Sequence, residues 1–264
     1  MIKALIFDWA GTTVDHGSLA PVLTLERVFA DSGIRVPHTV IRRDMGMAKR
    51  DHITRLLLEP EVVGAWSAAH REPPPADEVD RLYAAFLPLQ MECLLRYSHV
   101  LAGVPEAIAV FRGMGMQIGS TTGYTRAMLD ALVAAAEEEG YVPDAALTPE
   151  DSGAGRPSPA MCMAICRQFA IEPHECIKIG DTPSDIAEGR NAGMWTIGIT
   201  RTGNMVGLSK ADWDTTPADE QRALLEKAET ELLGQGAHAV AESVAESLPQ
   251  IEAIISRSTH DERP

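Results

Sequence analysis

The stretch MIKALIFDWAGTTVD, residues 1–15, begins with a short apolar run that ends at Asp8 and enters a glycine-containing turn. An apolar run of this length, closed by a turn, predicts a buried strand. From about residue 100 to residue 264, further short apolar runs alternate with segments of helical periodicity. This alternation predicts parallel βαβ units, and therefore an α/β fold with a doubly wound, Rossmann-like parallel sheet.

Residues 18–99 interrupt the alternation, because they show helical periodicity broken only by segments rich in proline and glycine. We therefore predict an α/β core built from residues 1–17 and 100–264, with an inserted α-helical domain between its two parts. An insert that follows the first strand lies over the carboxyl ends of the strands, where open α/β folds bind ligands. The insert is thus expected to act as a cap over the site.

The composition argues against several classes of partner. The formal net charge of −15, from 23 Lys and Arg against 38 Asp and Glu, disfavours binding to nucleic acid or to an anionic membrane. No apolar segment approaches the roughly 18 residues of a membrane helix, and the N-terminus lacks the pattern of a signal peptide. The four cysteines do not form a disulfide framework in a chain of this length. The sequence predicts a cytoplasmic protein with reduced thiols, and it leaves room for a small anionic substrate.

Polar side chains follow the ends of four predicted core strands, and parallel strands bring these ends to one edge of a sheet. In chain order they are Asp8, the run Ser120-Thr121-Thr122, Arg156, Asp181 and Asp185. Carboxylates bind a hard cation such as Mg²⁺, whereas hydroxyl, guanidinium and backbone N–H groups bind phosphoryl oxygens. Each segment alone is also typical of a turn, a helix cap or a solvated loop. Their shared placement at strand ends is what predicts a phosphoryl-transfer site.

The segments IFDWAGTT, IGSTTG, GRPSP and IGDTPSD resemble the motifs of the haloacid dehalogenase superfamily. The predicted insert also lies where that superfamily places its helical cap. The resemblance implies that Asp8 is a nucleophile that forms an aspartyl-phosphate. The ligands that it implies for one Mg²⁺ are Asp8, the Ala10 carbonyl and Asp181, with Asp185 either a ligand or a neighbour of one. The phosphoryl contacts that it implies are Gly11 in the glycine turn, Thr121 or Thr122, and Arg156.

Position 10 departs from the pattern of that superfamily, whose phosphatases carry a second aspartate there to protonate the leaving group. Ala10 indicates either a weak or inactive phosphatase, or a leaving group that needs no proton from this position. The insert segment RRDMGMAKRDHI supports the second interpretation, because Lys49 lies among apolar neighbours. Such a lysine can have a lowered pKa and form a Schiff base with a carbonyl compound. Lys49 and His52 are also compatible with ordinary roles, as a solvated cation and a structural histidine.

Together, DWAGTTVD, MGMAKRDH, STTGYT, GRPSP and EGRNAGMWT resemble the phosphonoacetaldehyde hydrolase family. The resemblance implies that Lys49 forms an imine with phosphonoacetaldehyde, whose C–P bond is cleaved to acetaldehyde and phosphate during 2-aminoethylphosphonate degradation. It places Met45 and His52 in the pocket of Lys49 and Tyr124 at its border, and it favours a homodimer formed through the cap. One alternative is a phosphatase of the same superfamily that acts on another small phosphorylated metabolite. Another is a non-catalytic phosphoryl-binding protein, which the retained Asp8 disfavours.

Overall fold

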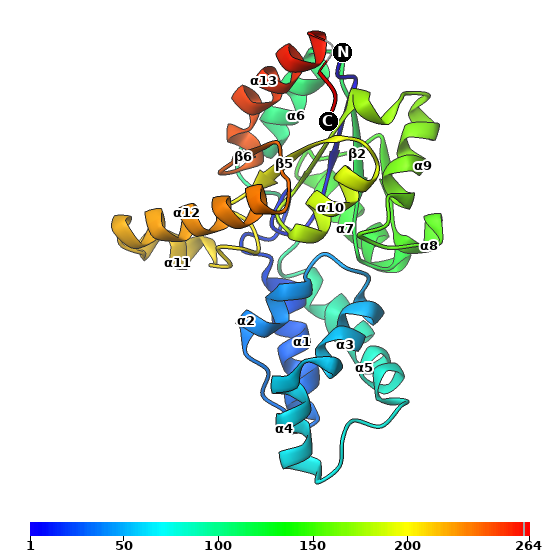
Figure 1. Cartoon of the computed structure of the whole chain (residues 1–264), viewed down its shortest axis with the longest axis vertical. Helices are drawn as coiled ribbons and strands as arrows, with labels where there is room; N and C mark the ends of the chain where they lie inside the picture. Colours follow the sequence, from blue (N-terminus) through cyan, green and yellow to red (C-terminus); the bar gives the residue numbers. More distant parts are fainter. Residues whose placement is uncertain (261) are drawn as a thin grey trace.

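The computed structural model describes residues 1–260 and 262–264, and a six-stranded parallel sheet forms the core of the part that lies above the helical lobe in Figure 1. The strands are β1 (Ala4–Phe7), β2 (Gln117–Thr121), β3 (Ala145–Leu147), β4 (Cys176–Gly180), β5 (Trp195–Ile199) and β6 (Ala239–Ala241). They lie in the order β3-β2-β1-β4-β5-β6, and each neighbouring pair is parallel. This order reverses direction at β1, as in a doubly wound sheet, so the predicted Rossmann-like α/β fold is confirmed.

Helices cover both faces of the sheet, because side chains alternate between the faces along each strand. On β1, Leu5 and Phe7 pack into one hydrophobic cluster, whereas Ala4 and Ile6 pack into another. The first cluster includes side chains of α6 (Val104–Gly113), α7 (Arg126–Glu138) and α13 (Leu248–Thr259). The opposite face is covered by α9 (Ala160–Phe169), α10 (Pro183–Asn191) and α12 (Ala218–Gly234). Both faces of the central strands are therefore buried, which explains why most of their residues are apolar.

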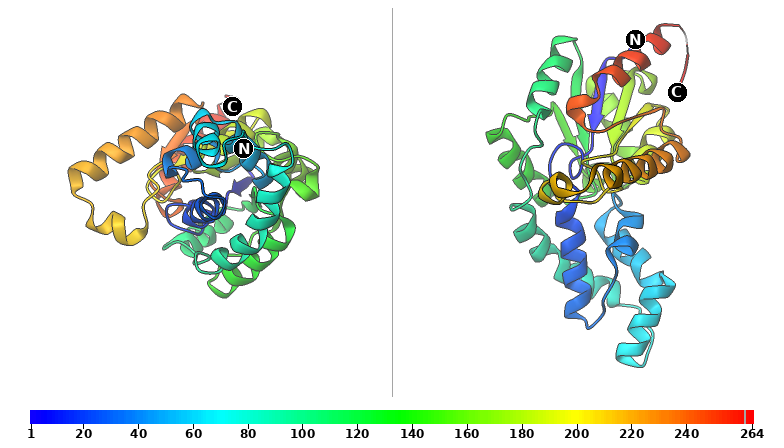
Figure 2. Two further views of the ribbon diagram at one scale, coloured as in Figure 1. Left: turned by 90° about the horizontal axis from the view of Figure 1, so that it is seen from below. Right: turned by 90° about the vertical axis from the view of Figure 1, so that its left-hand side faces the viewer.

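The chain between β1 and β2 forms a helical lobe at the edge of the sheet where the strands end (Figures 1 and 2). Its elements are α1 (Leu19–Asp31), α2 (His38–Ile41), the 3₁₀ turn η1 (Arg42–Asp44), α3 (Lys49–Leu58), α4 (Pro60–His70) and α5 (Glu78–Leu94). Within the lobe, α5 packs against both α1 and α3. The lobe, which contains no strand within residues 18–99, occupies the segment that we expect to be the cap.

Two segments differ from the sequence-based expectation. The segment DAALTPED, residues 144–151, follows a predicted helix and has the pattern of a strand, but the strand ends at Leu147, because Thr148 and Asp151 form a capping box that begins α8 (Pro149–Ser152). The sequence pattern does not predict the short helix α11 (Lys210–Thr215), which the Ser209 side chain caps. The four cysteines are free thiols, and three of them are buried. Within the described residues, no helix combines the length and the apolar character that crossing a membrane requires.

Candidate active site

The turn after β1 positions Asp8 by anchoring the next residue in the core. The carbonyl of Trp9 accepts backbone hydrogen bonds from residues 12–14, and its buried indole N–H donates to Ser120 Oγ at 3.0 Å. Gly11 adopts a φ of +82°, and a Cβ atom at this position would collide with the Asp181 carboxylate. The tight turn therefore leaves Asp8 at the carboxyl edge of the sheet, directly beside Asp181.

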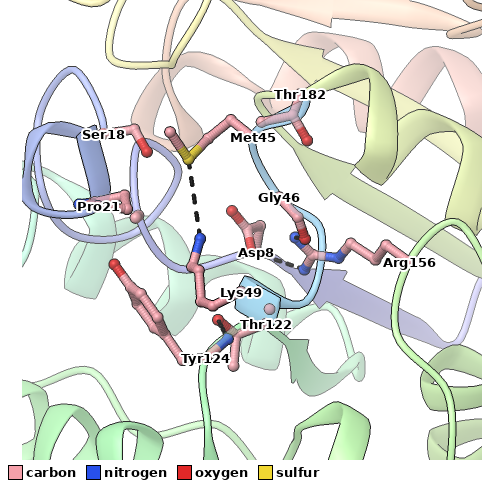
Figure 3. Close-up of a pocket in the computed structure, with 12 residues that line it drawn as sticks. Asp8, Ser18, Pro21, Met45, Gly46, Lys49, Thr122, Tyr124, Arg156 and Thr182 are labelled. Carbon is pink, nitrogen blue, oxygen red and sulfur yellow. Dashed lines mark hydrogen bonds and ion pairs between the residues drawn. The ribbon is translucent and has the colours of Figure 1, made fainter. Parts of the chain in front are cut away.

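A cavity of about 270 Å³, including its opening to solvent, lies between this edge and the helical lobe (Figure 3). The sheet side of its wall is formed by Asp8, Ala10, Thr122, Gly123, Tyr124, Arg156 and Thr182. The lobe and its connection contribute Ser18, Pro21, Met45, Gly46 and Lys49. The fold thus brings together side chains that are far apart in the sequence, at a position where α/β sheets bind ligands.

Arg156 is completely buried beside the cavity and is held by carboxylates on several sides. Its Nη2 donates to Asp8 Oδ1 at 2.7 Å and to the Thr121 carbonyl at 2.6 Å. Nη1 lies 3.0 Å from Asp185 Oδ1, and Nε donates to Glu188 Oε2 at 2.9 Å. Burial by itself would lower the pKa of Arg156, but the neighbouring carboxylates hold it well above its ordinary value. Arg156 therefore remains a fixed cation next to Asp8.

The buried pair Lys178 and Glu188, which is absent from the residues predicted for the site, supports this arginine. Lys178 projects from β4 and its Nζ lies 2.8 Å from Asp185 Oδ1 and 3.5 Å from Glu188 Oε2. All three side chains are fully buried. A lysine inside the otherwise apolar run CIKIG is the signal that could have revealed the pair, because lysines are rarely buried unless paired. Lys178 and Glu188 fix Asp185 and Arg156 from behind the cavity.

Asp8, Asp181 and Asp185 form a buried cluster, with one oxygen of each within 4.8 Å of the others. Burial, followed by the proximity of Asp8 and Asp185, raises the pKa of Asp181 well above its ordinary value. A divalent cation would neutralise this repulsion, and a set of carboxylates is the donor type that Mg²⁺ prefers. The residues present therefore fit a magnesium site.

Two further residues outside the predicted set, Thr12 and Asn204, orient Asp181. The backbone N–H of Asn204 donates to Asp181 Oδ2 at 2.7 Å, and Thr12 Oγ1 donates to Oδ1 at 3.3 Å. Asp185 is held differently, since its Oδ2 accepts from the backbone N–H and the hydroxyl of Thr182 at 3.2 and 2.6 Å. Asp181 thus faces the turn after β1, whereas both oxygens of Asp185 already accept hydrogen bonds from protein groups.

Lys49 begins α3 and reaches the cavity from the lobe, although its side chain is only 5% exposed. Its Nζ lies 3.9 Å from Met45 Sδ and 5.3 Å from the centre of the Tyr124 ring (Figure 3). Burial lowers the pKa of Lys49 to about 8, although the charge of Asp8 partly opposes this effect. At pH 7 about a tenth of the amine is therefore neutral, and the amine lies in the same cavity as Asp8.

Three of the residues predicted to contact the substrate do not line the cavity, and neither do the predicted metal ligands Asp181 and Asp185. His52 is fully buried, its Nε2 is 2.8 Å from the Ile41 carbonyl, and burial lowers its pKa to about 3. Thr121 lies behind Arg156, where its hydroxyl donates to Glu188, whereas Thr122 is in the cavity wall. Gly11 lies against the Asp181 carboxylate and is not part of the cavity wall. Of the two threonines, Thr122 is thus the one positioned to contact a ligand.

Known proteins with similar sequences and structures identify the family. The family model for haloacid dehalogenase-like hydrolases matches residues 2–193. A phosphonoacetaldehyde hydrolase of Nitratidesulfovibrio vulgaris is 39% identical over 264 residues, which cover 100% of this chain and 94% of that protein. One from Bacillus cereus is 38% identical over 262 residues, or 97% of this chain and 99% of that protein. The crystal structure of a phosphonoacetaldehyde hydrolase-like protein from Oleispira antarctica has a TM-score of 0.97 at 36% identity, covering 100% of this chain and 96% of that one.

The sheet order, the clustered carboxylates at its carboxyl edge and the helical insert above them define a haloacid dehalogenase-like hydrolase. The relatives at 38–39% identity match almost the whole chain, insert included. Within this class, the chain belongs to the phosphonoacetaldehyde hydrolase family.

Proposed function

We propose that this hydrolase cleaves the C–P bond of phosphonoacetaldehyde to give acetaldehyde and phosphate. The observation that carries the proposal is one cavity that contains a buried amine, Lys49, and a strand-end carboxylate, Asp8, with no carboxylate at Ala10. The names of the relatives are consistent with this substrate. Removal of the amino group of 2-aminoethylphosphonate would supply it.

Direct cleavage of the C–P bond would expel a carbanion, and Lys49 provides a way to avoid this. Its neutral amine condenses with the aldehyde, releasing water and forming an imine, which is then protonated. When the C–P bond breaks, its electron pair moves into the C–C bond, and the C=N electrons move onto nitrogen, leaving a neutral enamine. Protonation at carbon followed by hydrolysis of the resulting imine releases acetaldehyde and restores Lys49. No proton from position 10 is needed.

Asp8 receives the phosphoryl group in this proposal. Its carboxylate attacks phosphorus as the C–P bond breaks and forms an aspartyl-phosphate, which water then hydrolyses to phosphate. Arg156, fixed 2.7 Å from Asp8 Oδ1, and the Thr122 hydroxyl in the cavity wall would contact the phosphoryl oxygens. The net reaction consumes one water and produces one acetaldehyde and one phosphate.

We propose that Asp8, the Ala10 carbonyl and Asp181 hold one Mg²⁺, and that Asp185 lies next to these ligands without binding the cation itself. When bound, this cation supplies electrostatic stabilisation of the charge on the transferring phosphoryl group. Asp185, whose oxygens accept from Lys178 and Thr182, contributes its negative charge and the alignment of Arg156.

The substrate assignment is tested by incubating the protein and Mg²⁺ with phosphonoacetaldehyde and measuring both products. We expect acetaldehyde and phosphate in equal amounts, and hydrolysis of a simple phosphate ester slower by about 10²-fold or more, because position 10 lacks the general acid. Ester hydrolysis at a comparable rate, without acetaldehyde release, would instead favour a phosphatase that acts on another small metabolite.

The pKa of Lys49 predicts a pH dependence. Only the neutral amine forms the imine, so kcat/KM is expected to rise about tenfold per pH unit below about 8 and to level off above it. Measurement from about pH 6 to about pH 10 at constant ionic strength tests this expectation, because kcat/KM reports the free enzyme. A kcat/KM that keeps rising up to about pH 10, toward the ordinary lysine pKa of 10.5, would show that burial does not lower the pKa of the reacting amine.

A further inference from the structure

Arg42, in the η1 turn of the lobe, is bound by the sheet domain through both its side chain and its backbone. Its Nη1 donates to the Gly17 carbonyl at 2.8 Å and to Asn204 Oδ1 at 2.9 Å, and its Nη2 donates to the Gly207 carbonyl at 3.0 Å. In the reverse direction, Asn204 Nδ2 donates to the Arg42 carbonyl at 3.1 Å. Arg42 therefore joins the lobe to the loop after β5 and to the connection between the domains.

The loop after β5 is built to receive this guanidinium. Gly207 has a φ of +68°, and a Cβ atom there would lie 2.7 Å from Arg42 Cζ. Gly17 has a φ of +86°, and its Cβ would collide with the Leu208 carbonyl. Two of the acceptor carbonyls thus belong to glycines at which any side chain would disturb the contact.

Asn204 connects this contact to the carboxylate cluster. It is only 1% exposed, and its backbone N–H donates to Asp181 Oδ2 at 2.7 Å while its side chain binds Arg42. The preceding residue, Gly203, also lies against Asp181, since a Cβ there would be 2.6 Å from the Asp181 Cβ. Asn204 therefore contacts Arg42 of the lobe through its side chain and Asp181 through its backbone N–H.

The neighbouring arginine provides an internal comparison. Arg43 is exposed and forms ion pairs with Glu59 and Glu61, at 2.9 and 3.2 Å, entirely within the lobe. Arg42 is half-buried, and burial lowers its pKa. Removing a guanidinium from water is costly unless its donors are satisfied, and here the sheet domain supplies the oxygens that satisfy them. Arg42 thus favours the arrangement in which the lobe lies against the sheet.

We propose that Arg42 and Asn204 form a latch that holds the lobe closed and, in the same contact, aligns Asp181. Lys49 follows Arg42 by seven residues in the same segment of the lobe, so engagement of the latch keeps the amine in the cavity of Asp8. The two residues are positioning residues, because they do not line the cavity. The kinetic consequence of the latch rests on the proposed function, whereas its effect on domain closure does not.

The kinetic test compares Arg42→Gln, Arg42→Lys and Asn204→Ala with Arg43→Gln as the matched control. Asn204→Ala removes the side chain and keeps the backbone N–H to Asp181. For Arg42→Gln and Asn204→Ala we expect a loss of about 10- to 100-fold in kcat/KM, with KM raised and kcat lowered. Arg42→Lys should lose less kcat/KM than Arg42→Gln, since lysine retains the positive charge but lacks the several fixed N–H donors of the guanidinium. The double variant Arg42→Gln/Asn204→Ala should lose little more kcat/KM than Arg42→Gln alone, because the two residues act through one contact. The kcat/KM of Arg43→Gln should stay within about twofold of wild type.

Hydrogen–deuterium exchange without Mg²⁺ or substrate tests the latch independently of activity. Amides of residues 202–207 should exchange about tenfold faster in Arg42→Gln and Asn204→Ala than in wild type or Arg43→Gln. Unchanged exchange, together with kcat/KM within about twofold of wild type, would overturn the latch. If Arg42→Gln fails to fold, Asn204→Ala and Arg42→Lys decide the question. If wild type does not cleave phosphonoacetaldehyde, the proposed function fails while the exchange result still tests the latch.

Discussion

Replacement of Lys49 by arginine is expected to abolish phosphate release from phosphonoacetaldehyde, with a loss on the order of 10⁴-fold or more in kcat/KM. Arginine keeps a cation at the start of α3, but a guanidinium is not deprotonated in proteins and forms no imine. A role of Lys49 as a cation that only attracts the phosphonate would survive this change. Phosphate and acetaldehyde release, measured at saturating Mg²⁺, distinguishes the two roles.

Arg50→Gln is the matched control for this experiment. Arg50 is adjacent to Lys49 but exposed, and its Nη2 pairs with Asp80 at 2.5 Å on the surface of the lobe. We expect its kcat/KM to stay within about twofold of wild type, because exposed ion pairs contribute little. A folded Lys49→Arg protein that kept a tenth of the wild-type activity would refute the imine route.

Replacement of Asp8 by asparagine is expected to separate the two halves of the reaction. Phosphate release should fall on the order of 10⁴-fold, since an amide cannot replace the carboxylate as nucleophile. The imine should still form, because Lys49 belongs to the lobe and its amine does not depend on Asp8 as a nucleophile. Borohydride treatment in the presence of phosphonoacetaldehyde should therefore leave a phosphonoethyl group on Lys49, detected by peptide mass spectrometry.

Lys49→Arg provides the negative control for this labelling, since it should yield no adduct at position 49. An Asp8→Asn protein that releases phosphate at more than about a tenth of the wild-type rate would show that another group attacks phosphorus. Labelling of a different lysine in place of Lys49 would contradict the assignment of the amine, even with Asp8 confirmed as the nucleophile.

The sheet and its helical insert could be predicted because their signals are local. The runs around Asp8, Thr121 and Asp181 are apolar, short and closed by turns, so each strand end could be read without knowledge of its neighbours. Parallel topology then implied that these ends share one edge. The prediction failed where side chains cap the backbone, as at Thr148, because the same residues are common in turns and at helix starts.

The sequence by itself determined the α/β class, the helical insert, and the residue types available at the strand ends, including the alanine at position 10. These follow from the periodicity of apolar residues, which is a property of neighbouring positions. Only the tertiary structure decided that Thr122 rather than Thr121 lines the cavity, and that Arg42 faces the sheet domain while Arg43 stays within the lobe. Adjacent residues of one type are nearly indistinguishable in a sequence, whereas the direction of each side chain depends on segments packed from far along the chain. Arg42 and Asn204, 162 positions apart, meet only because the insert folds back over the edge of the sheet.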